Sequence, residues 1–231
     1  MLLLLSNIKG NIEKELRDFY SKYGRDGVVT YSEARKWISN NDHRRRLTAL
    51  LLYVQENFDE LQTKLTPKFC EMLVNVIGKE TKFFDVDPTD VVNKALKENW
   101  CTDEKNWLER LEDDIALWCA YILIDLKQSF LKGMPLDKVL TKLDKRFSSM
   151  EYVLTTLGLS ESTAVGSMAR RMIFQQLGIT KYQFYTKADE RTCEVCGSMH
   201  GLIFPISAYE IGVTASPLHP RCRCWEVPIV D

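Results

Sequence analysis

The first three quarters of the chain carry hydrophobic residues at steps of three and four, the spacing of one face of an α-helix. The first such run predicts a helix over residues 12–23, and Gly24 is placed to end it. Thr30 and Glu33 then form a capping-box pattern, in which a hydroxyl and a carboxylate satisfy backbone N–H groups at a helix start. A short helix is therefore expected to carry Ala34, Trp37 and Ile38.

Longer helices are predicted downstream, each from its own start signal. Asp42 is expected to open a helix with a broad apolar face. Thr66-Pro67 has the form of an N-cap followed by proline at the first helical position, so a separate helix is predicted to begin there. Asp87-Pro88 has the same form and predicts another helix start.

The second half of the helical region continues this periodicity. Thr102 is placed to cap the longest helix, and Gly133 is placed to end it. Two further helices are predicted over residues 136–150 and 160–177, with Gly178 as the C-cap.

The longest apolar run, residues 115–124, is about half of what a membrane span requires. It is expected to be a helix buried on nearly all sides. The leucines at positions 2–5 follow no basic segment and are too few for a secretory signal, so a buried or partner-docking N-terminus is expected. The expected compartment is then reducing, where paired cysteines favour metal binding over disulfides.

The sequence changes character after Gly178. Residues 182–186 alternate loosely as a strand does, and glycines and prolines punctuate the rest. The prediction is a mostly α-helical protein, with a helical body over residues 1–178 and a small α+β, β-rich Cys/His module over residues 179–231. The module is too short to be stabilised by burial alone.

Composition and charge narrow the classes of function. With 45% hydrophobic and 27% charged residues the chain is typical of a soluble globular protein, and its net charge of −1 argues against a uniformly basic nucleic-acid coat.

Residues 163–187 nevertheless contain no acidic residue, and aromatic residues interleave with the basic ones. Such a stretch can follow a phosphate backbone and stack bases, or its aromatics can be core and its charges solvated. The candidate nucleic-acid-binding residues are Arg170, Arg171, Lys181 and Lys187.

Cysteines cluster in the module, which holds four of the seven. Two residues separate Cys193 from Cys196, a spacing that lets a tight knuckle aim both sulfurs at one ion. His219 and Cys222 follow at a distance that allows two knuckles to share a tetrahedral ion. These four residues are the preferred ligand set for a structural zinc.

Alternatives to this set remain open. Cys224 can replace Cys222, and His200 is the weakest of the candidate ligands. The four cysteines can also be reduced and buried, or form two disulfides in an exported or extracellular particle. The cysteines outside the module are expected to be small buried hydrophobes: Cys70, Cys101 and Cys119.

The sequence does not favour an enzyme, and no catalytic residue is assigned. It contains no phosphate-binding loop, no GxGxxG and no HExxH. The deaminase signature, H-x-E with P-C-x-x-C, does not fit either, because Gly201-Leu202 follows His200. A cysteine nucleophile paired with one of the module's histidines has no further signature to support it.

The residues of the module follow a distinctive order. Tyr182-x-Phe-x-Thr leads into Asp189-Glu-Arg-Thr-Cys193-x-x-Cys196, then His200-Gly201, then Pro217-x-His219-Pro-x-Cys222-Arg-Cys224. This order resembles the C-terminal signature of phage minor head proteins, the Mu F-like head morphogenesis proteins of tailed phages and prophages. One departure is that many relatives carry an Arg-Thr-Glu-like segment in the preceding helix, where this chain has Met168-Ala-Arg-Arg-Met172 without the Glu.

The resemblance implies a minor capsid protein of the virion, located in the head interior at the portal vertex and in the host cytoplasm during assembly. The implied main partner is the portal protein, and the major capsid or scaffolding protein and the packaged DNA are further ones. No membrane span is expected. The alternative function is a nucleic-acid-binding zinc module that acts in DNA packaging or delivery.

Overall fold

The computed structural model describes residues 2–36 and 45–230. The predictions made for Trp37, Ile38 and Asp42 lie outside these residues. The chain divides into two compact units: the first unit is Met1–Pro67 with Glu112–Val153, and the second unit is Lys68–Leu111 with Leu154–Asp231. The boundary proposed at residue 178 stays a prediction about which segments fold on their own.

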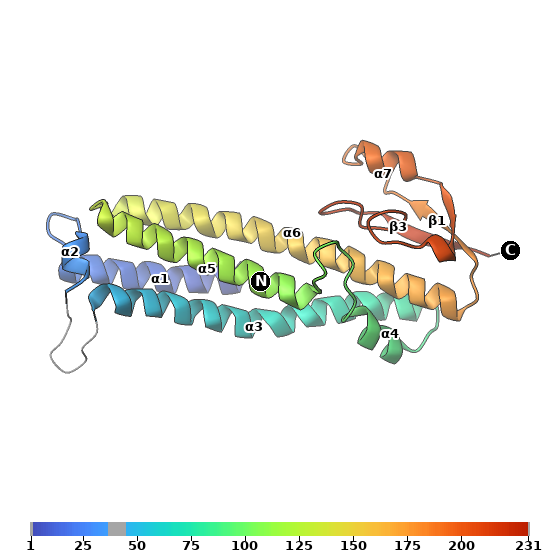
Figure 1. Ribbon diagram of the computed structural model, residues 1–231, viewed down its shortest axis with the longest axis horizontal. Coiled ribbons are helices and arrows are strands. Elements are labelled where there is room, and N and C mark those ends of the chain that lie inside the picture. Colours follow the sequence, from blue (N-terminus) through green and yellow to red (C-terminus); the bar gives the residue numbers. More distant parts are fainter. Residues whose placement is uncertain (1, 37–44, 231) are drawn as a thin grey trace. The chain divides into compact units, whose positions relative to one another are not determined.

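Helices make up most of the described chain (Figure 1). They are α1 (Leu2–Tyr23), α2 (Tyr31–Ala34), α3 (Arg46–Phe83), α4 (Pro88–Ala95), α5 (Trp107–Leu131), α6 (Leu136–Gln176) and the short α7 (Glu194–Met199). The strands are β1 (Lys181–Tyr185), β2 (Ile203–Pro205) and β3 (Trp225–Ile229), with a 3₁₀ turn at Ile206–Ala208. The predicted fold class, mostly α with a small β-rich Cys/His region, is confirmed.

In the first unit, α1 packs with α5 and with the parts of α3 and α6 that belong to this unit. Aromatic rings fill the core, with the ring centroids of Phe19 and Phe130 5.5 Å apart and those of Phe58 and Phe147 6.2 Å apart. Burying each such side chain contributes roughly 1.5–3 kcal/mol. The apolar periodicity of the sequence therefore predicted this core correctly.

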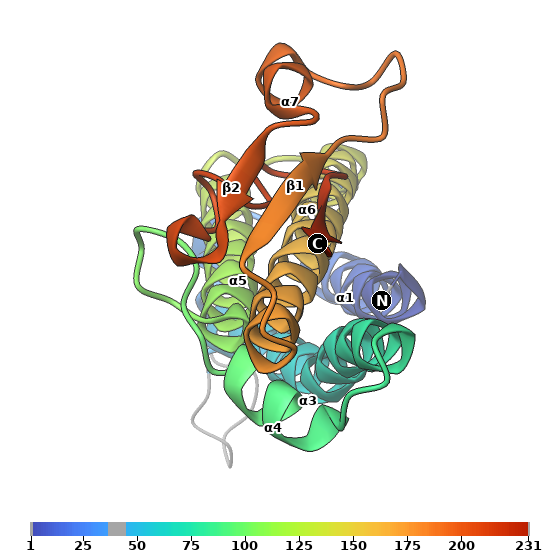
Figure 2. The ribbon, with the colours of Figure 1, turned by 90° about the vertical axis from the view of Figure 1, so that its right-hand side faces the viewer.

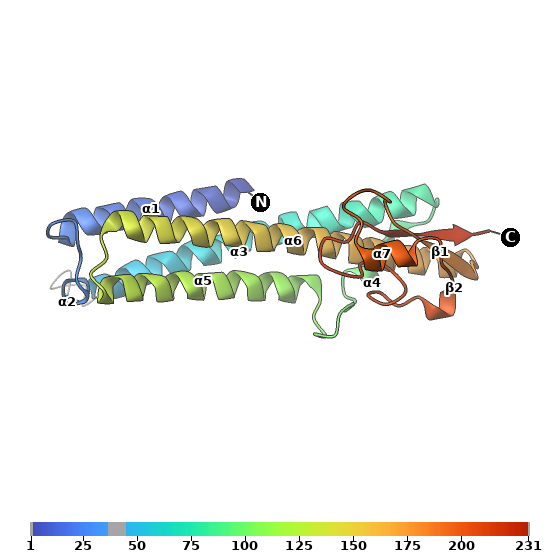
Figure 3. The same ribbon diagram turned by 90° about the horizontal axis from the view of Figure 1, so that it is seen from above.

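The apolar run at residues 115–124 is only half buried, contrary to the prediction. Ile115 and Ile122 face the core, but Leu117 and Ile124 are 46% and 49% exposed. Figure 3 shows α5 along the edge of the helical part, with neighbouring helices on one side only.

The predicted helix start at Thr66-Pro67 is wrong, because α3 runs without interruption through Pro67. Proline at an internal position removes one backbone hydrogen bond. The buried apolar seam nevertheless continues across it at helical spacing, so packing keeps the helix intact: Phe58, Leu61, Leu65, Phe69, Leu73 and Ile77.

The two helices predicted over residues 136–150 and 160–177 are one helix, α6. Gly158 lies between them, and glycine costs a helix about 1 kcal/mol relative to alanine. It is buried against Phe69 and Met72, whose nearest atoms would be 3.6 Å and 3.7 Å from an added Cβ. Tertiary packing therefore outweighs the weak local preference at this position.

The predicted helix ends are mostly correct. Asp87 caps α4 by accepting from the N–H of Thr89 at 2.7 Å, and Gly178 ends α6 with a φ of +68°. The cap predicted at Thr102 is wrong, because α5 begins at Trp107. Asn106 caps it instead, accepting from the N–H of Leu108 at 2.9 Å.

The sheet has the strand order β2-β1-β3, and both pairings are antiparallel. Figure 2 shows β1 and β2 side by side, with the C-terminal strand on the other side of β1. On β1, Tyr182 and Phe184 are fully buried, while the alternate residues lie on the outer face. Phe184 shares its apolar cluster with three of the module's cysteines, so the sheet and the candidate metal ligands form one core.

None of the helices in the described part of the chain is both long enough and apolar enough to cross a membrane.

Candidate metal centre

The first knuckle is built by the turn that starts α7. Asp189 accepts from the backbone N–H of Arg191 at 3.1 Å and closes a local turn before the cysteines. Cys193 is the N-cap of α7, and its Sγ accepts from the N–H of Cys196 at 3.4 Å. The two-residue spacing thus brings both sulfurs to the same side of the turn.

The second arm carries His219 and Cys222. The Nδ1 of His219 lies 2.8 Å from the carbonyl oxygen of Pro220, so the protonated Nδ1 donates there and Nε2 is left as the ligand atom. The carbonyl of Cys222 accepts from the hydroxyl of Thr163 at 3.0 Å. Arg221, with a φ of +61°, lies between the two candidate ligands.

Arg221 and Thr163 hold this arm against α6 within the second unit. The backbone N–H of Arg221 donates to Ser160 at 3.1 Å, and its Nε donates to Thr156 at 2.8 Å. The arm is therefore positioned by a helix rather than by the loop alone.

The four preferred ligands lie in two overlapping groups, one of Cys193, Cys196 and His219 and one that joins Cys196 to Cys222. His219 Nε2 lies 3.3 Å from Cys193 Sγ and 3.2 Å from Cys196 Sγ, and Cys196 Sγ lies 3.7 Å from Cys222 Sγ. Tetrahedral zinc with ordinary bond lengths places sulfurs about 3.8 Å apart, and sulfur and nitrogen about 3.6 Å apart. The donor set suits zinc and the three distances are close to these values, but Cys222 does not share one group with Cys193 and His219, so binding one ion through all four ligands would require Cys222 to move closer.

Cys224 is the surplus candidate. Its Sγ groups with those of Cys196 and Cys222, while a second group consists of Cys193, Cys196 and His219. Cys196 belongs to both groups, so either Cys222 or Cys224 can complete a four-ligand set. The structure keeps this alternative open.

The thiols of the cluster differ in pKa because they are hydrogen-bonded to one another and are buried to different extents. The hydrogen bond from Cys224 lowers the pKa of Cys222 to about 5, and the same contact raises the pKa of Cys224. Burial raises the pKa of Cys196 to about 12, whereas the backbone N–H of Cys196 lowers the pKa of Cys193. Burial lowers the pKa of His219, but the hydrogen bond to Pro220 and the nearby thiols outweigh it and raise the value.

The remaining cysteines and His200 lie apart from these groups. His200 Nδ1 accepts from the N–H of Thr186 at 3.2 Å, which agrees with its low rank as a ligand. Cys119 is buried as predicted, but Cys70 is only half buried and Cys101 is exposed. The prediction of a buried position is therefore wrong for Cys101. All seven cysteines are free thiols in the structure.

Comparison with known proteins bears on this region. Residues 121–227 match the family model described as Phage Mu protein F like protein. The resemblance to phage head morphogenesis proteins is confirmed over these residues. No curated protein and no solved structure matches the chain significantly.

The Mu F-like region contains a buried ionic network that sequence reasoning missed. Glu226 on β3 accepts from Arg170 at 3.1 Å, Ser167 at 3.0 Å and Tyr209 at 2.9 Å. Its second oxygen accepts from the backbone N–H of Ser216 at 2.6 Å. Burial, and then the charge of Glu226, raise the pKa of Tyr209 well above its ordinary value. One signal in the sequence could have indicated this network. Arg170 directly follows a run of small and apolar residues, which suggests a buried charge that needs a partner.

The network changes the interpretation of the basic residues on α6. Arg170 is 7% exposed and also donates to Glu80 at 2.5 Å. Arg171 donates to both oxygens of Glu98, at 2.5 Å and 2.7 Å. Their charges are matched within the second unit. The exposed pair among the four predicted residues is Lys181 and Lys187.

A second missed pair supports the first knuckle. Arg223 donates to both carboxylate oxygens of Asp189 at 2.6 Å, a bidentate contact. The hydrogen bonds from Arg223 hold the pKa of Asp189 well below its ordinary value. The pair joins the turn before Cys193 to the segment that carries Cys222 and Cys224, so it can set the spacing between the two arms.

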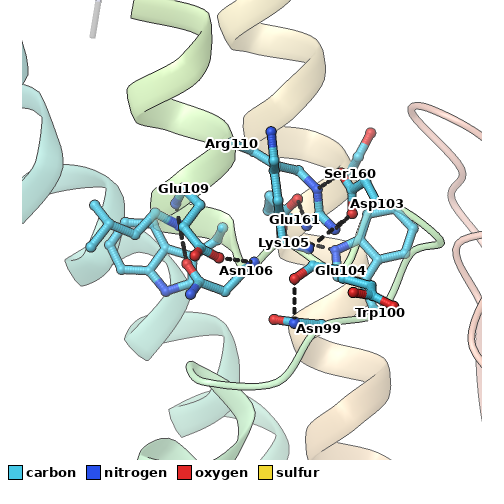
Figure 4. A network of polar contacts seen from close by, with 12 residues as sticks. Asn99, Trp100, Asp103, Glu104, Lys105, Asn106, Glu109, Arg110, Ser160 and Glu161 are labelled. Carbon is cyan, nitrogen blue, oxygen red and sulfur yellow. Dashed lines mark hydrogen bonds and ion pairs between the residues drawn. The ribbon is translucent and has the colours of Figure 1, made fainter.

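Another polar network joins the loop before α5 to α6 within the second unit (Figure 4). Arg110 donates to Glu161 at 2.8 Å and makes two bonds to Asp103. The indole N–H of Trp100 donates to the other oxygen of Glu161 at 3.0 Å. Burial raises the pKa of Glu161, and the charge of Arg110 opposes that shift. Glu161 adjoins Ser160, so this network stiffens the part of α6 that anchors the second arm.

Proposed function

We propose that the chain is a minor capsid protein, a head morphogenesis structural component of a tailed phage or prophage, and not an enzyme. The observation that carries this proposal is the family match over residues 121–227, which includes both arms of the Cys/His cluster. Its proposed place is the head interior at the portal vertex, reached from the host cytoplasm during assembly. The portal protein is the main proposed partner, and the major capsid or scaffolding protein is a further one.

The Cys/His cluster is proposed to hold a structural zinc ion through Cys193, Cys196, His219 and Cys222. Zinc bound by four protein ligands has no open position for a substrate, so it acts as a staple. The ligands come from two segments that the sheet and α6 bring together, and the ion would join them. This role accords with the shortness of the module, which has little apolar surface to bury.

Metal analysis of the purified chain, combined with a count of reactive thiols, tests the staple. About one zinc per chain with protected module thiols is expected. A metal-free protein with all module thiols reactive, or with two disulfides, would contradict the proposal.

The capsid role has its own test. In a phage or prophage that encodes this chain, deletion of its gene is expected to lower the yield or infectivity of particles, and the chain is expected in purified heads in few copies. Co-purification with the portal protein tests the proposed partner directly. Purified heads that lack the chain, with unchanged infectivity after deletion, would sink the proposal.

A role in DNA packaging or delivery is the second candidate. Lys181 and Lys187 are exposed, and Tyr185 stacks on Trp225 with ring centroids 6.1 Å apart on the outer side of the sheet. Basic side chains beside stacked aromatics suit a nucleic-acid strand. Binding should weaken steeply with salt and fall in a Lys181→Glu/Lys187→Glu variant. Binding that is undetectable at low salt would dispose of this candidate.

A further inference from the structure

Three buried cysteines form an all-sulfur group within the Cys/His cluster. The Sγ atoms of Cys196, Cys222 and Cys224 all lie within 4.8 Å of one another, and we call these residues the sulfur triad. The Sγ atoms of Cys196 and Cys222 are 3.7 Å apart, and the three residues are 2%, 3% and 5% exposed. The other group of the cluster differs in both respects, because it adds the exposed Cys193 and the nitrogen of the half-buried His219.

The side chains that pack around the sulfur triad are apolar. Phe184 shares its buried core, and Met199, Phe204 and Leu218 pack against it. None of these four side chains offers a nitrogen or oxygen ligand, whereas Met199 brings a thioether, which is a further soft donor. A metal ion at the triad would therefore be surrounded by sulfur and hydrocarbon.

This donor set discriminates between metal ions. Zinc in structural sites almost always takes four ligands, so at the triad alone it would lack one. Cu(I) is a softer ion that thiolates and thioethers select, and it is stable with three sulfur ligands. Cu(II) prefers nitrogen and oxygen ligands in a tetragonal arrangement, which the triad does not supply. The chemistry of the site therefore favours Cu(I).

We propose that the sulfur triad is a binding site for a soft, thiophilic cation, with Cu(I) as the ion that fits it best. The inference rests on the proposed metal-binding role of the cluster, but it uses a different ligand set, in which Cys224 takes part and His219 does not. Cys196 and Cys222 are shared with the zinc staple, so the two ions compete and Cu(I) is expected to displace zinc. The three sulfurs of the triad already form one group, whereas the zinc set needs Cys222 to move closer to the knuckle.

Titration of the reduced, metal-free full chain with Cu(I), in competition with a chromophoric Cu(I) chelator and without oxygen, tests the site. About one Cu(I) ion per chain is expected, and X-ray absorption at the copper edge should show sulfur ligands only. Cys224→Ala should weaken Cu(I) binding at least about tenfold, whereas His219→Ala should leave it unchanged. The matched control is Cys119→Ala, because Cys119 is buried to the same degree, at 3% exposed, but belongs to neither group.

Zinc titration of the same variants separates the sulfur triad from the zinc staple. Zinc affinity should fall in His219→Ala and remain in Cys224→Ala, the reverse of the order expected for Cu(I). Retention of zinc by Cys224→Ala would also show that the cluster is still folded in that variant.

Three results would each overturn the proposal. They are a wild type that takes up no Cu(I), a nitrogen ligand in its copper spectrum, and a Cys224→Ala variant that binds Cu(I) as tightly as the wild type. The first two need no variant, so they hold even if a substitution unfolds the module. Zinc binding that fails while the Cu(I) results hold would overturn the staple alone and support the triad.

Discussion

Arg170 on α6 and Glu226 on β3 form an ion pair 3.1 Å apart, with both side chains buried. Glu226 also accepts from Ser167, Tyr209 and the backbone of Ser216, so its carboxylate is fully hydrogen-bonded. The pair joins the last strand of the sheet to the helix that anchors the second arm of the metal centre. The pair therefore helps to hold β3 against the helix that anchors this arm.

Breaking this pair should be costly. Glu226→Gln leaves Arg170 buried with one carboxylate partner instead of two, and we expect a loss of about 3–5 kcal/mol in the free energy of unfolding. Urea denaturation followed by circular dichroism measures it. The control is Glu60→Gln, because Glu60 and Lys64 form an exposed pair whose removal should cost less than about 1 kcal/mol. Equal losses in the two variants would mean that Arg170 finds another way to be solvated.

Removing both charges of the pair should cost less than removing one. In Arg170→Met/Glu226→Gln the buried guanidinium is gone and only Glu80, whose side chain is 24% exposed, loses a partner, so the double variant is expected to be more stable than Glu226→Gln alone. Urea denaturation of the wild type, the two single variants and the double variant gives a double-mutant cycle for this pair. Additive losses would show that the two side chains do not depend on each other.

The cysteines offer a matched comparison for the metal centre. Cys193 and Cys101 are both exposed, but Cys193 alone belongs to a ligand group. Cys193→Ala is expected to lower zinc affinity at least about tenfold and to lower the unfolding temperature, whereas Cys101→Ala should leave both unchanged. Zinc titration with a competing chelator gives the affinity. Identical affinities in the two variants would remove Cys193 from the ligand set.

The two histidines of the module give a second comparison, because only one of them lies at the cysteine sulfurs. His219 places Nε2 between two sulfurs, whereas His200 uses its Nδ1 to accept from the backbone of Thr186. His219→Ala should lose the metal, and His200→Ala should retain it with a small loss of stability, about 1 kcal/mol for one hydrogen bond. Spectra of the cobalt-substituted chain report the ligand set directly. A cobalt spectrum that changes in His200→Ala and not in His219→Ala would reverse the assignment.

The helices were largely predictable, and the errors lie at helix boundaries. Local signals at Pro67 and Thr102 suggested helix boundaries, and a break was predicted between residues 150 and 160, but the buried apolar pattern runs across Pro67 and through α6, and Asn106 supplies a better cap than Thr102. Local propensity is worth about 1 kcal/mol per residue, less than the packing of a long buried face. Periodicity was therefore the more reliable guide.

The sequence grouped three of the candidate ligands, whereas the side chains that support the site could not be predicted from it. The spacing of Cys193, Cys196 and His219 brought them into one group, as expected from knuckle geometry. Arg170 was a candidate for contacting a phosphate backbone, yet it is buried against Glu226, 56 residues away in sequence. A partner at that separation leaves no local pattern, because only the tertiary fold brings the two side chains together.

The Asp103 carboxylate is expected to make the stability of the fold depend on pH. The hydrogen bonds from Arg110 are the largest influence on Asp103 and lower its pKa to about 2. A depressed pKa stabilises the folded state above the unfolded pKa of about 3.9, and that contribution is lost as the pH falls toward 2. Because Asp103 is 41% exposed, solvent screening reduces the effect to about 1 kcal/mol or less.

The Asp103→Asn variant isolates that contribution. It should be less stable than the wild type at pH 6, and the difference should shrink as the pH falls from about 4 to about 2, where Asp103 becomes protonated in both states. Thermal unfolding of both proteins across this range measures the difference. Arg110 stays paired with buried Glu161 in the variant, so the loop before α5 should remain folded. A stability difference that is constant with pH would show that Asp103 contributes through packing rather than through its charge.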